Sequence, residues 1–181
     1  MKEQLRKKFL KTRKDRYFIL DKKKRNFISN KLKQICRSNK IKKLGFYYPT
    51  NYEIDILSVL FKIKNIDLYL PVIKKKNDMS FKLHKVQEPL FVNRFGILEP
   101  NKKNKTEKPQ IILVPVVAFD KNKNRLGYGK GFYDRFLNKS NYKKNILSIG
   151  IAFSFQQIKN IPLEKHDKRL DYILTEKSII N

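Results

Sequence analysis

The segment IILVPVVAFDKNKNRLGYGKGFYDR, residues 111–135, decides the fold that we predict for this chain. Residues 111–119 form an apolar run, which predicts a strand buried on both faces of a sheet. Three glycines at alternate positions, Gly127, Gly129 and Gly131, come next, and a helix pattern starts directly after them. This order predicts an α/β protein with a ligand-binding loop at the carboxyl end of a central strand.

The loop between Arg125 and Arg135 has the composition of an anion site. Its glycines allow the backbone to approach an anion closely, Arg125 and Lys130 add positive charge, and the next helix presents its positive end. These features favour a nucleoside triphosphate. The spacing matches neither GxGxxG nor GxxxxGK[ST], so it supports neither a Rossmann dinucleotide site nor a Walker loop. The alternative is a glycine-rich turn that only joins strand to helix.

Hydrophobic periodicity predicts the other elements. Residues 2–38 read as helices, with an apolar stripe of Phe27, Ile28, Leu32 and Ile35. The remaining expectations are a strand at 46–48, a helix at 54–63, a strand at 66–73, a hairpin or edge pair from 81–86 and 90–92, a loop at 101–108, a helix from 132–137, and strands at 146–153 and 171–175. Together they predict one domain over residues 1–181: a three-layer α/β/α sandwich around a mainly parallel sheet, with N-terminal helices.

The extreme net charge of the chain does not by itself indicate its function. The formal net charge is +27 over 181 residues, which alone would indicate a nucleic-acid partner. The lysines are spread through every segment, and even the densest cluster, residues 7–24, has apolar residues at helical spacing, which favours a solvated helix face over a nucleic-acid arm. The single cysteine, Cys36, lies in a helical pattern and indicates a packing role in a reducing compartment.

The longest apolar stretches are too short to cross a bilayer, and the N-terminus has no apolar signal region behind its charges. We therefore expect a cytoplasmic protein without membrane contact. His84 and His166 are isolated and have no spacing typical of zinc ligands.

Motifs along nearly the whole chain resemble one enzyme family. The pattern around the loop, VP…AFD…RLGxGxGxYD at positions 114–134, resembles the signature of the 5-formyltetrahydrofolate cyclo-ligases, also called 5,10-methenyltetrahydrofolate synthetases. Further matches in the same order are Tyr48-Pro49, Glu53-Ile54-Asp55, Leu70-Pro71-Val72, FGIxEP at 95–100, Gly150-Ile151-Ala152, Asp167 and Asp171.

The resemblance implies an enzyme that uses ATP and Mg²⁺ to convert 5-formyltetrahydrofolate to 5,10-methenyltetrahydrofolate, with release of ADP and phosphate. It implies a phosphorylated formyl group, an iminium phosphate, as the intermediate. We expect a monomer without a specific nucleic-acid partner. The alternatives are a basic nucleic-acid-binding protein, which leaves the glycine loop unexplained, and a related α/β protein that binds another phosphorylated metabolite.

The resemblance also implies the site residues. The catalytic group is Arg125, Lys130 and Tyr133. The ATP-binding residues are Lys2, Arg6, Arg125, Leu126, Gly127, Tyr128, Gly129, Lys130, Gly131, Phe132 and Tyr133. The folate-binding residues are Tyr48, Glu53, Gly129, Lys130, Gly131 and Phe132, and the magnesium ligands are Asp134 and Asp167.

From the residues alone, several of these assignments have plain alternatives. Asp134 lies in a first helical turn and either complements the helix dipole or holds Mg²⁺. Asp167 reads as part of an ordinary charged loop, and Glu53 as a helix N-terminal carboxylate. Lys2 and Arg6 lie four residues apart and so share a helix face, but they are two cations among many. Phe132 and Tyr133 either stack on the flat folate ring or belong to the core.

Overall fold

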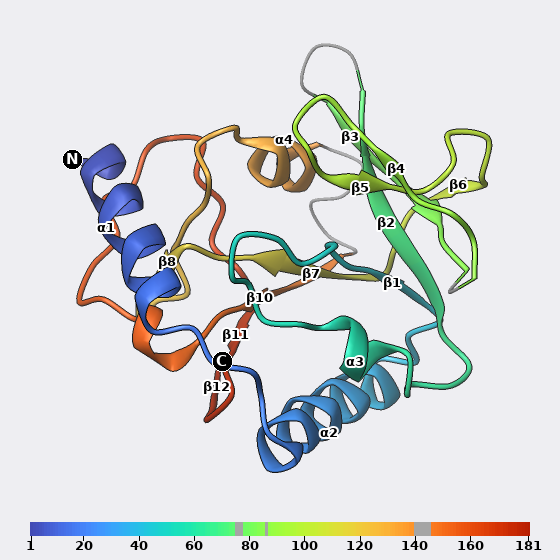
Figure 1. Ribbon diagram of the computed structural model, residues 1–181, viewed down its shortest axis with the longest axis horizontal. Coiled ribbons are helices and arrows are strands. Elements are labelled where there is room, and N and C mark those ends of the chain that lie inside the picture. The colour runs from blue at the N-terminus through green and yellow to red at the C-terminus, as the bar shows by residue number, and fades with distance from the viewer. Residues whose placement is uncertain (75–77, 86, 140–145) are drawn as a thin grey trace.

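The structure is a computed structural model that describes residues 1–74, 78–85, 87–139 and 146–181 (Figure 1). The strands of its eight-stranded sheet run in the order β12 (Ile179–Ile180), β11 (Tyr172–Leu174), β10 (Leu147–Ile151), β7 (Ile111–Pro115), β1 (Lys43–Gly45), β2 (Asp67–Ile73), β3 (Met79–Leu83) and β6 (Thr106–Glu107). The pairings from β11 to β2 are parallel, and the outer strands β12, β3 and β6 pair antiparallel. The five parallel strands therefore end at one common edge of the sheet.

Helices cover both faces of this sheet (Figure 1). α2 (Lys22–Ser38) and α3 (Leu57–Leu60) pack against one face, and α4 (Phe132–Asn138) packs against the other. The predicted three-layer α/β fold, the mainly parallel sheet and the N-terminal helices are confirmed. The single domain over residues 1–181 stays a prediction.

The central strand β7 separates the two cores. Ile111 and Leu113 point into the core under α2, and Ile112 and Val114 point into the core under α4. All four side chains are 0% exposed, as the apolar run predicts for a strand buried on both faces. Burying a side chain of this size contributes about 1.5–3 kcal/mol relative to exposure, so this strand anchors both layers.

The predicted strand at 111–119 is wrong in its second half. β7 ends at Pro115, which has no N–H group with which to continue the ladder. Residues Ala118–Phe119 form β8, which pairs antiparallel with β9 (Arg125–Leu126) in a separate two-stranded ribbon. The ribbon projects from the carboxyl edge of the sheet and leads directly into the glycine loop.

α2 forms from the predicted apolar stripe. The side chain of Asp21 caps its first turn by accepting a hydrogen bond from the N–H of Lys24 at 2.8 Å. Ile28, Leu32 and Cys36 follow one another at single-turn spacing and are all buried in the same core. The packing role predicted for Cys36 is therefore confirmed.

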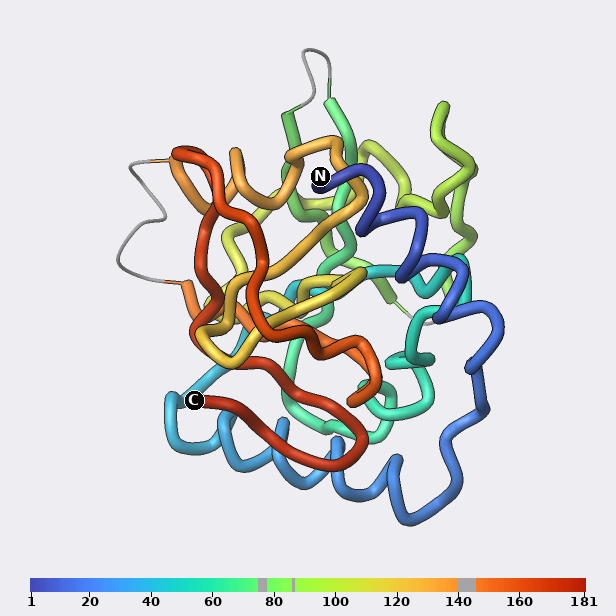
Figure 2. Tube along the Cα trace, turned by 90° about the vertical axis from the view of Figure 1, so that its left-hand side faces the viewer, coloured from blue at the N-terminus to red at the C-terminus, as the bar shows by residue number. Residues whose placement is uncertain are grey.

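α1 (Lys2–Asp15) lies against the β8–β9 ribbon and not against the sheet. Its Phe9 packs with Val117, Ala118 and Leu126 in a third apolar cluster. Figure 2 shows this helix in blue along one side of the molecule, with its first turns beside the segment that precedes α4. This placement brings the N-terminus to the carboxyl edge of the sheet.

Two short elements differ from the prediction near Pro49. The strand expected at 46–48 lies earlier, at 43–45, although the N–H of Phe46 still bonds the carbonyl of Tyr69 at 2.9 Å. The helix expected at 54–63 is reduced to the single turn of α3, because Ile54 and Ile56 enter the core from non-helical backbone before it begins.

The expected pairing of 81–86 with 90–92 is also wrong. β3 pairs with β2 and β6 instead, while β4 (Phe91–Val92) pairs with β5 (Leu98–Glu99). Position 86 lies outside the described residues. Period-2 alternation marks strands but not their partners, which explains this error. The predicted strands at 66–73, 146–153 and 171–175 correspond to β2, β10 and β11, and β6 and β12 were not anticipated.

Candidate active site at the carboxyl edge of the sheet

The glycine loop, residues 127–131, joins β9 to α4 at this edge. Gly129 has φ of 88° and Gly131 has φ of 65°, which is the left-handed region that side chains disfavour. Gly131 occupies the position before the first residue of α4. The glycines therefore allow this left-handed backbone conformation and also leave the surface of the loop free of side chains at their positions.

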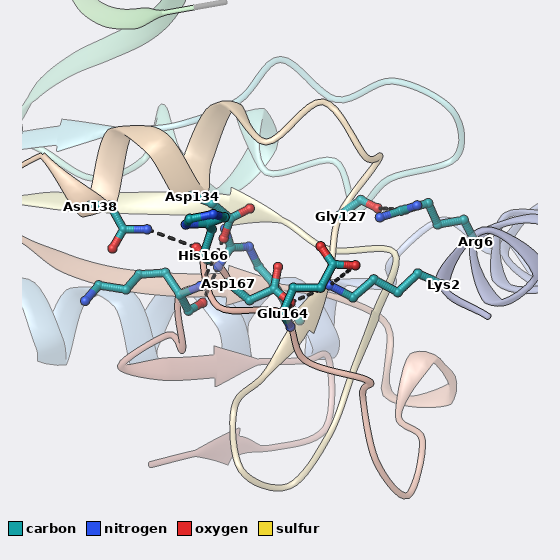
Figure 3. Close-up of polar contacts among 10 residues, drawn as sticks. Lys2, Arg6, Gly127, Asp134, Asn138, Glu164, His166 and Asp167 are labelled. Carbon is teal, nitrogen blue, oxygen red and sulfur yellow. Dashed lines mark hydrogen bonds and ion pairs between the residues drawn. The ribbon is translucent and has the colours of Figure 1, made fainter.

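α1 lies beside this loop and brings two cations to this edge of the sheet (Figure 3). The Nε of Arg6 donates a hydrogen bond to the carbonyl of Gly127 at 3.0 Å. A Cβ atom on Gly129 would stand 3.2 Å from the guanidinium carbon of Arg6. One turn earlier, the Nζ of Lys2 lies 2.5 Å from Asp167 and 3.2 Å from Glu164. Arg6 therefore contacts the glycine loop, and Lys2 contacts the segment 164–167 beside it.

 

Arg6 and Gly127 are 121 positions apart in the sequence, so their contact is a product of the tertiary fold. Lys2 and Arg6 lie on one helix face, as predicted, so Arg6 reaches the glycine loop and Lys2 reaches Asp167.

A buried ion pair lies behind the glycine loop. Arg125 is 7% exposed, and one of its terminal nitrogens donates to Asp134 at 2.6 Å while the other donates to the carbonyl of Lys168 at 2.5 Å. The same oxygen of Asp134 accepts from the N–H of Lys168 at 3.1 Å. Burial lowers the pKa of Arg125, and the charge of Asp134 opposes that effect. Asp134 therefore ties β9, α4 and the 164–168 segment together.

Asp167 forms the second cation–carboxylate pair, with Lys2. Burial acts to raise the pKa of Asp167, but hydrogen bonds from Lys2 and from the N–H of Glu164 outweigh it and hold the pKa below its ordinary value. Figure 3 shows Asp134 and Asp167 in the same region, together with Glu164 and His166. The two predicted metal ligands are thus brought together, and each already holds a predicted phosphate-binding cation.

The two carboxylates of Asp134 and Asp167 suit a Mg²⁺ ion that binds together with a nucleotide. Within the described residues, no group of three or more His, Cys, Asp or Glu side chains is placed to hold a metal ion. Mg²⁺ in nucleotide sites is commonly held by one or two carboxylates together with phosphate oxygens and water. Asp134 and Asp167 supply two carboxylates beside Lys2 and Arg125, which fits that mode of binding.

Glu53 lies on the other side of the glycine loop, in the segment after β1. It is 7% exposed, and its carboxylate accepts from the N–H of Thr50 at 2.8 Å and from the hydroxyl of Tyr128 at 2.5 Å. Burial raises the pKa of Glu53, against the hydrogen bonds from Tyr128 and Thr50 and the charge of Arg13. Tyr128 was predicted with the ATP-binding loop, but its hydroxyl points to the folate-binding candidate.

Arg13 is a residue that our sequence analysis missed. It is 1% exposed and donates to the hydroxyl of Tyr128 at 2.5 Å and to the carbonyl of Val116 at 3.3 Å. Two full turns of α1 separate it from Arg6, so it shares the face that carries Arg6 and Lys2. That spacing was the available signal, but it was hidden among the many cations of the N-terminal segment.

The remaining predicted residues surround the loop. Tyr133 is half-buried, and burial followed by the charge of Glu53 raises the pKa of its hydroxyl. The ring of Phe132 meets the ring of Phe95 at a centroid distance of 5.6 Å. Tyr48 packs at the margin of the core under α2, and the side chain of Lys130 is exposed.

One hollow of the molecule lies away from the glycine loop. Its volume is about 960 Å³, and it opens between β2, β3 and the β4–β5 ribbon, with lining residues that include Lys74, Lys82, Phe91 and Glu99. Among the described residues that line it, none is a predicted site residue. We place the candidate site at the glycine loop because the charged groups Arg6, Arg125 and Asp134 converge there. No helix among the described residues is long and apolar enough to span a membrane.

Comparisons with known proteins agree with the α/β fold and identify the family. Residues 1–176 match the 5-formyltetrahydrofolate cyclo-ligase family. The 5-formyltetrahydrofolate cyclo-ligase of Haemophilus influenzae is 34% identical over 139 residues, which cover 72% of this chain and 74% of that protein.

Solved structures give the same result. An NMR structure of the Aquifex aeolicus 5,10-methenyltetrahydrofolate synthetase matches with a TM-score of 0.75 and 33% identity, over 98% of this chain and 91% of that one. The 5,10-methenyltetrahydrofolate synthetase of Mycoplasma pneumoniae matches with a TM-score of 0.69 and 26% identity, over 97% of this chain and 98% of that one. The chain therefore belongs to the 5-formyltetrahydrofolate cyclo-ligase family.

Proposed function

We propose that this protein converts 5-formyltetrahydrofolate to 5,10-methenyltetrahydrofolate and uses one ATP, with Mg²⁺, for each ring closure. The observation that carries the proposal is the pair of neighbours Gly127 and Tyr128. Gly127 contacts Arg6 on the cationic side of the loop, and Tyr128 contacts the buried Glu53 on the other side. Adjacent residues of one short loop therefore contact a cation suited to phosphate and a carboxylate suited to the N–H groups of a pterin. A reaction between two bound substrates requires that their binding groups lie this close together.

The chemistry needs activation of a poor leaving group. The formyl oxygen of the substrate attacks the γ-phosphorus of ATP, the bond from that phosphorus to the bridging oxygen of ADP breaks, and an iminium phosphate forms. The neighbouring folate nitrogen then attacks the formyl carbon and loses its proton, and the oxygen leaves with the phosphate. The original oxygen of the formyl group thus ends in inorganic phosphate. No protein nucleophile is required, so the protein's task is to orient both substrates and to stabilise charge.

Lys2, Arg6 and Lys130 stabilise the phosphate charge in this proposal. Lys130 is exposed and so can turn toward a nucleotide on the loop surface, and the glycine N–H groups add hydrogen-bond donors. Arg125 is held in place by Asp134 before any ligand binds, which limits the reorganisation needed in the transition state. When bound, Mg²⁺ would be held by Asp134 and Asp167 and would neutralise charge on the phosphates.

Tyr133 and Glu53 act on the folate side of the reaction. The raised pKa of Tyr133 keeps its hydroxyl protonated at neutral pH, so it can donate a hydrogen bond to an oxygen that gains charge. Glu53 accepts from the paired N–H groups of the pterin, while Tyr48 and Phe132 contact the flat ring. We further propose that the protein works as a cytoplasmic monomer.

An absorbance assay for 5,10-methenyltetrahydrofolate tests the proposal. We expect product only when 5-formyltetrahydrofolate, ATP and Mg²⁺ are all present, with one ADP formed for each product molecule. The net charge of +27 makes some weak, salt-labile nucleic-acid binding expected, and that binding alone decides nothing. Selective nucleic-acid binding at physiological salt by a folded sample that forms no product would overturn the proposal.

A further inference from the structure

A buried relay connects α1 to the folate end of the site. It runs from Arg13 through the hydroxyl of Tyr128 to the carboxylate of Glu53, and both hydrogen bonds are 2.5 Å long. The three residues come from α1, from the glycine loop and from the segment after β1. The relay therefore ties the helix that carries Lys2 and Arg6 to the proposed pterin acceptor.

The chemistry of the three groups fixes the direction of the relay. A guanidinium group only donates hydrogen bonds, so the Tyr128 oxygen must accept from Arg13. The single proton of that hydroxyl is then left for Glu53, whose oxygen must accept it. The positive charge of Arg13 adds to this, because burial raises the pKa of Glu53 and that charge lowers it. Arg13 thereby favours the ionised, acceptor-only form of Glu53.

Arg13 is costly to bury, which argues for a role beyond packing. Its Nε finds no hydrogen-bond partner among the described residues. Leaving a buried donor unpaired costs about 1–3 kcal/mol. The carbonyl of Val116, which Arg13 also contacts, already accepts from the side chain of Gln156 at 2.7 Å, so that carbonyl does not depend on Arg13. The hydrogen bond from Arg13 to the Tyr128 hydroxyl, in contrast, is not duplicated by another side chain among the described residues.

Resting on the proposed function, we propose that Arg13 is a positioning residue for folate: through Tyr128 it keeps the buried Glu53 as a carboxylate aimed at the pterin. A carboxylate offers about four acceptor positions. The Tyr128 hydroxyl and the Thr50 N–H occupy two of them at 2.5 and 2.8 Å, and the Thr50 hydroxyl makes a long contact of 3.5 Å with a third. Two N–H groups of a pterin edge would therefore use the remaining position and displace the weak contact of the Thr50 hydroxyl.

The electrostatics agree with this geometry. The groups whose charges couple to Glu53 are Arg13 from α1, Tyr128 from the loop, Tyr133 from α4 and Tyr47 on its own segment. Of these, Arg13 is the cation. Its loss removes an effect that lowers the pKa of Glu53, while burial continues to raise that pKa. Without Arg13, Glu53 should therefore take up a proton at a higher pH.

The test uses variants at both links of the relay and a matched control. Arg13→Met removes the charge and the donors but keeps an apolar side chain of similar length. Tyr128→Phe removes only the hydroxyl, so it tests the relay even if Arg13→Met folds poorly. Lys14→Met removes one positive charge from the exposed neighbour on the same helix. Carbon-13 NMR of the glutamate carboxyls, with Glu53→Gln to assign the signal, reports the titration of Glu53 directly.

We expect Glu53 to titrate at higher pH in Arg13→Met and in Tyr128→Phe, and as in the wild type in Lys14→Met. The apparent KM for 5-formyltetrahydrofolate should rise about tenfold in both relay variants, with the KM for ATP changed less than about twofold. Arg13→Lys, which keeps the charge, should recover part of the loss. The acidic limb of kcat/KM for folate should move to higher pH, which a purely structural defect would not cause.

The two proposals fail in different ways. A shifted Glu53 titration in a protein that forms no methenyltetrahydrofolate would overturn the proposed function and leave the relay standing. An unchanged Glu53 titration in folded Arg13→Met and Tyr128→Phe proteins would overturn the role of Arg13, whatever the wild-type activity.

Discussion

The two ends of the candidate site hold their charges in different ways. At the phosphate end, Lys2 and Arg125 contact Asp167 and Asp134 directly, and the two carboxylate side chains are 24% and 28% exposed. At the folate end, Arg13 reaches Glu53 only through Tyr128, and both charged residues are buried. The first arrangement leaves its carboxylates partly exposed although the side chain of Arg125 is buried, while the second encloses the carboxylate of Glu53.

In the proposed function, this difference explains how one loop would serve two substrates. In the proposed function, phosphates and Mg²⁺ replace the partners within the Lys2–Asp167 pair, since Lys2 then faces phosphate and the carboxylate faces metal. The role that we propose for Glu53 is different, because a neutral pterin edge needs acceptors that are ordered before it binds. A change at one end should therefore alter the binding of its own substrate more than the binding of the other substrate.

The largest effect is expected for Gly129→Val. A valine at a φ of 88° is strained by about 1–2 kcal/mol, and its Cβ would stand 3.2 Å from the guanidinium carbon of Arg6. Because the loop backbone would then move from the phosphates, kcat/KM for ATP should fall roughly 100-fold or more. Steady-state kinetics with varied ATP checks this.

Gly96→Val is the matched control for strain. Its φ is 73°, and a Cβ there meets nothing within 4 Å. It should lower the melting temperature to a similar extent without a comparable loss in ATP affinity. Near-normal ATP kinetics in a folded Gly129→Val protein would separate the glycine loop from phosphate binding.

A smaller, two-part effect is expected for Asp134→Asn. The charge that pairs with the buried Arg125 is lost, so the free energy of unfolding should fall by about 1–3 kcal/mol. The Mg²⁺ concentration for half-maximal rate should rise roughly tenfold, because an amide is a weaker ligand for a hard cation. Thermal unfolding and a magnesium titration of the rate measure the two parts. Lower stability with an unchanged magnesium titration would assign Asp134 to structure alone.

The smallest effect is expected at a pair remote from both ends. Glu107 in β6 pairs with Lys105 and with Lys43 of β1, and these partners lower its pKa from 4.5 to about 2. A depressed carboxylate pKa stabilises the fold above the unfolded value, and this contribution is lost as pH falls through the folded value. Glu107→Gln should therefore be slightly less stable than the wild type at pH 7, and the difference should vanish between about pH 4.5 and about 2.

Denaturation at several pH values measures this difference. The turnover of Glu107→Gln at neutral pH should match that of the wild type. A changed KM for either substrate would show that the remote edge of the sheet is coupled to the site.

Patterns in the sequence predicted what depends on local chemistry. The apolar run around Ile111 predicts a doubly buried strand, because only such a strand hides both faces, and the glycines at 129 and 131 predict a backbone that other residues disfavour. Asp167 joined the site only through the family resemblance. Its contact with Lys2 links positions 165 residues apart and has no local pattern.

Local sequence patterns could not predict the features that depend on tertiary packing. The apolar run could not reveal that Pro115 ends the strand and turns the chain into the β8–β9 ribbon. Arg13 looks like any other cation in a lysine-rich helix, and its value depends on burial against Tyr128. In the same way, the pairing of Asp134 with Arg125 depends on how α4 meets β9.

Crossed calorimetric titrations of Lys2→Met and Glu53→Gln test the central claim most directly. Each variant receives ATP with Mg²⁺ in one experiment and 5-formyltetrahydrofolate in another, with Lys7→Met as the exposed control on α1. We expect Lys2→Met to lose about tenfold in ATP affinity and less than about twofold in folate affinity, and Glu53→Gln to show the reverse. Equal losses for both ligands in either variant, or the opposite pattern, would contradict a site with a separate phosphate end and folate end.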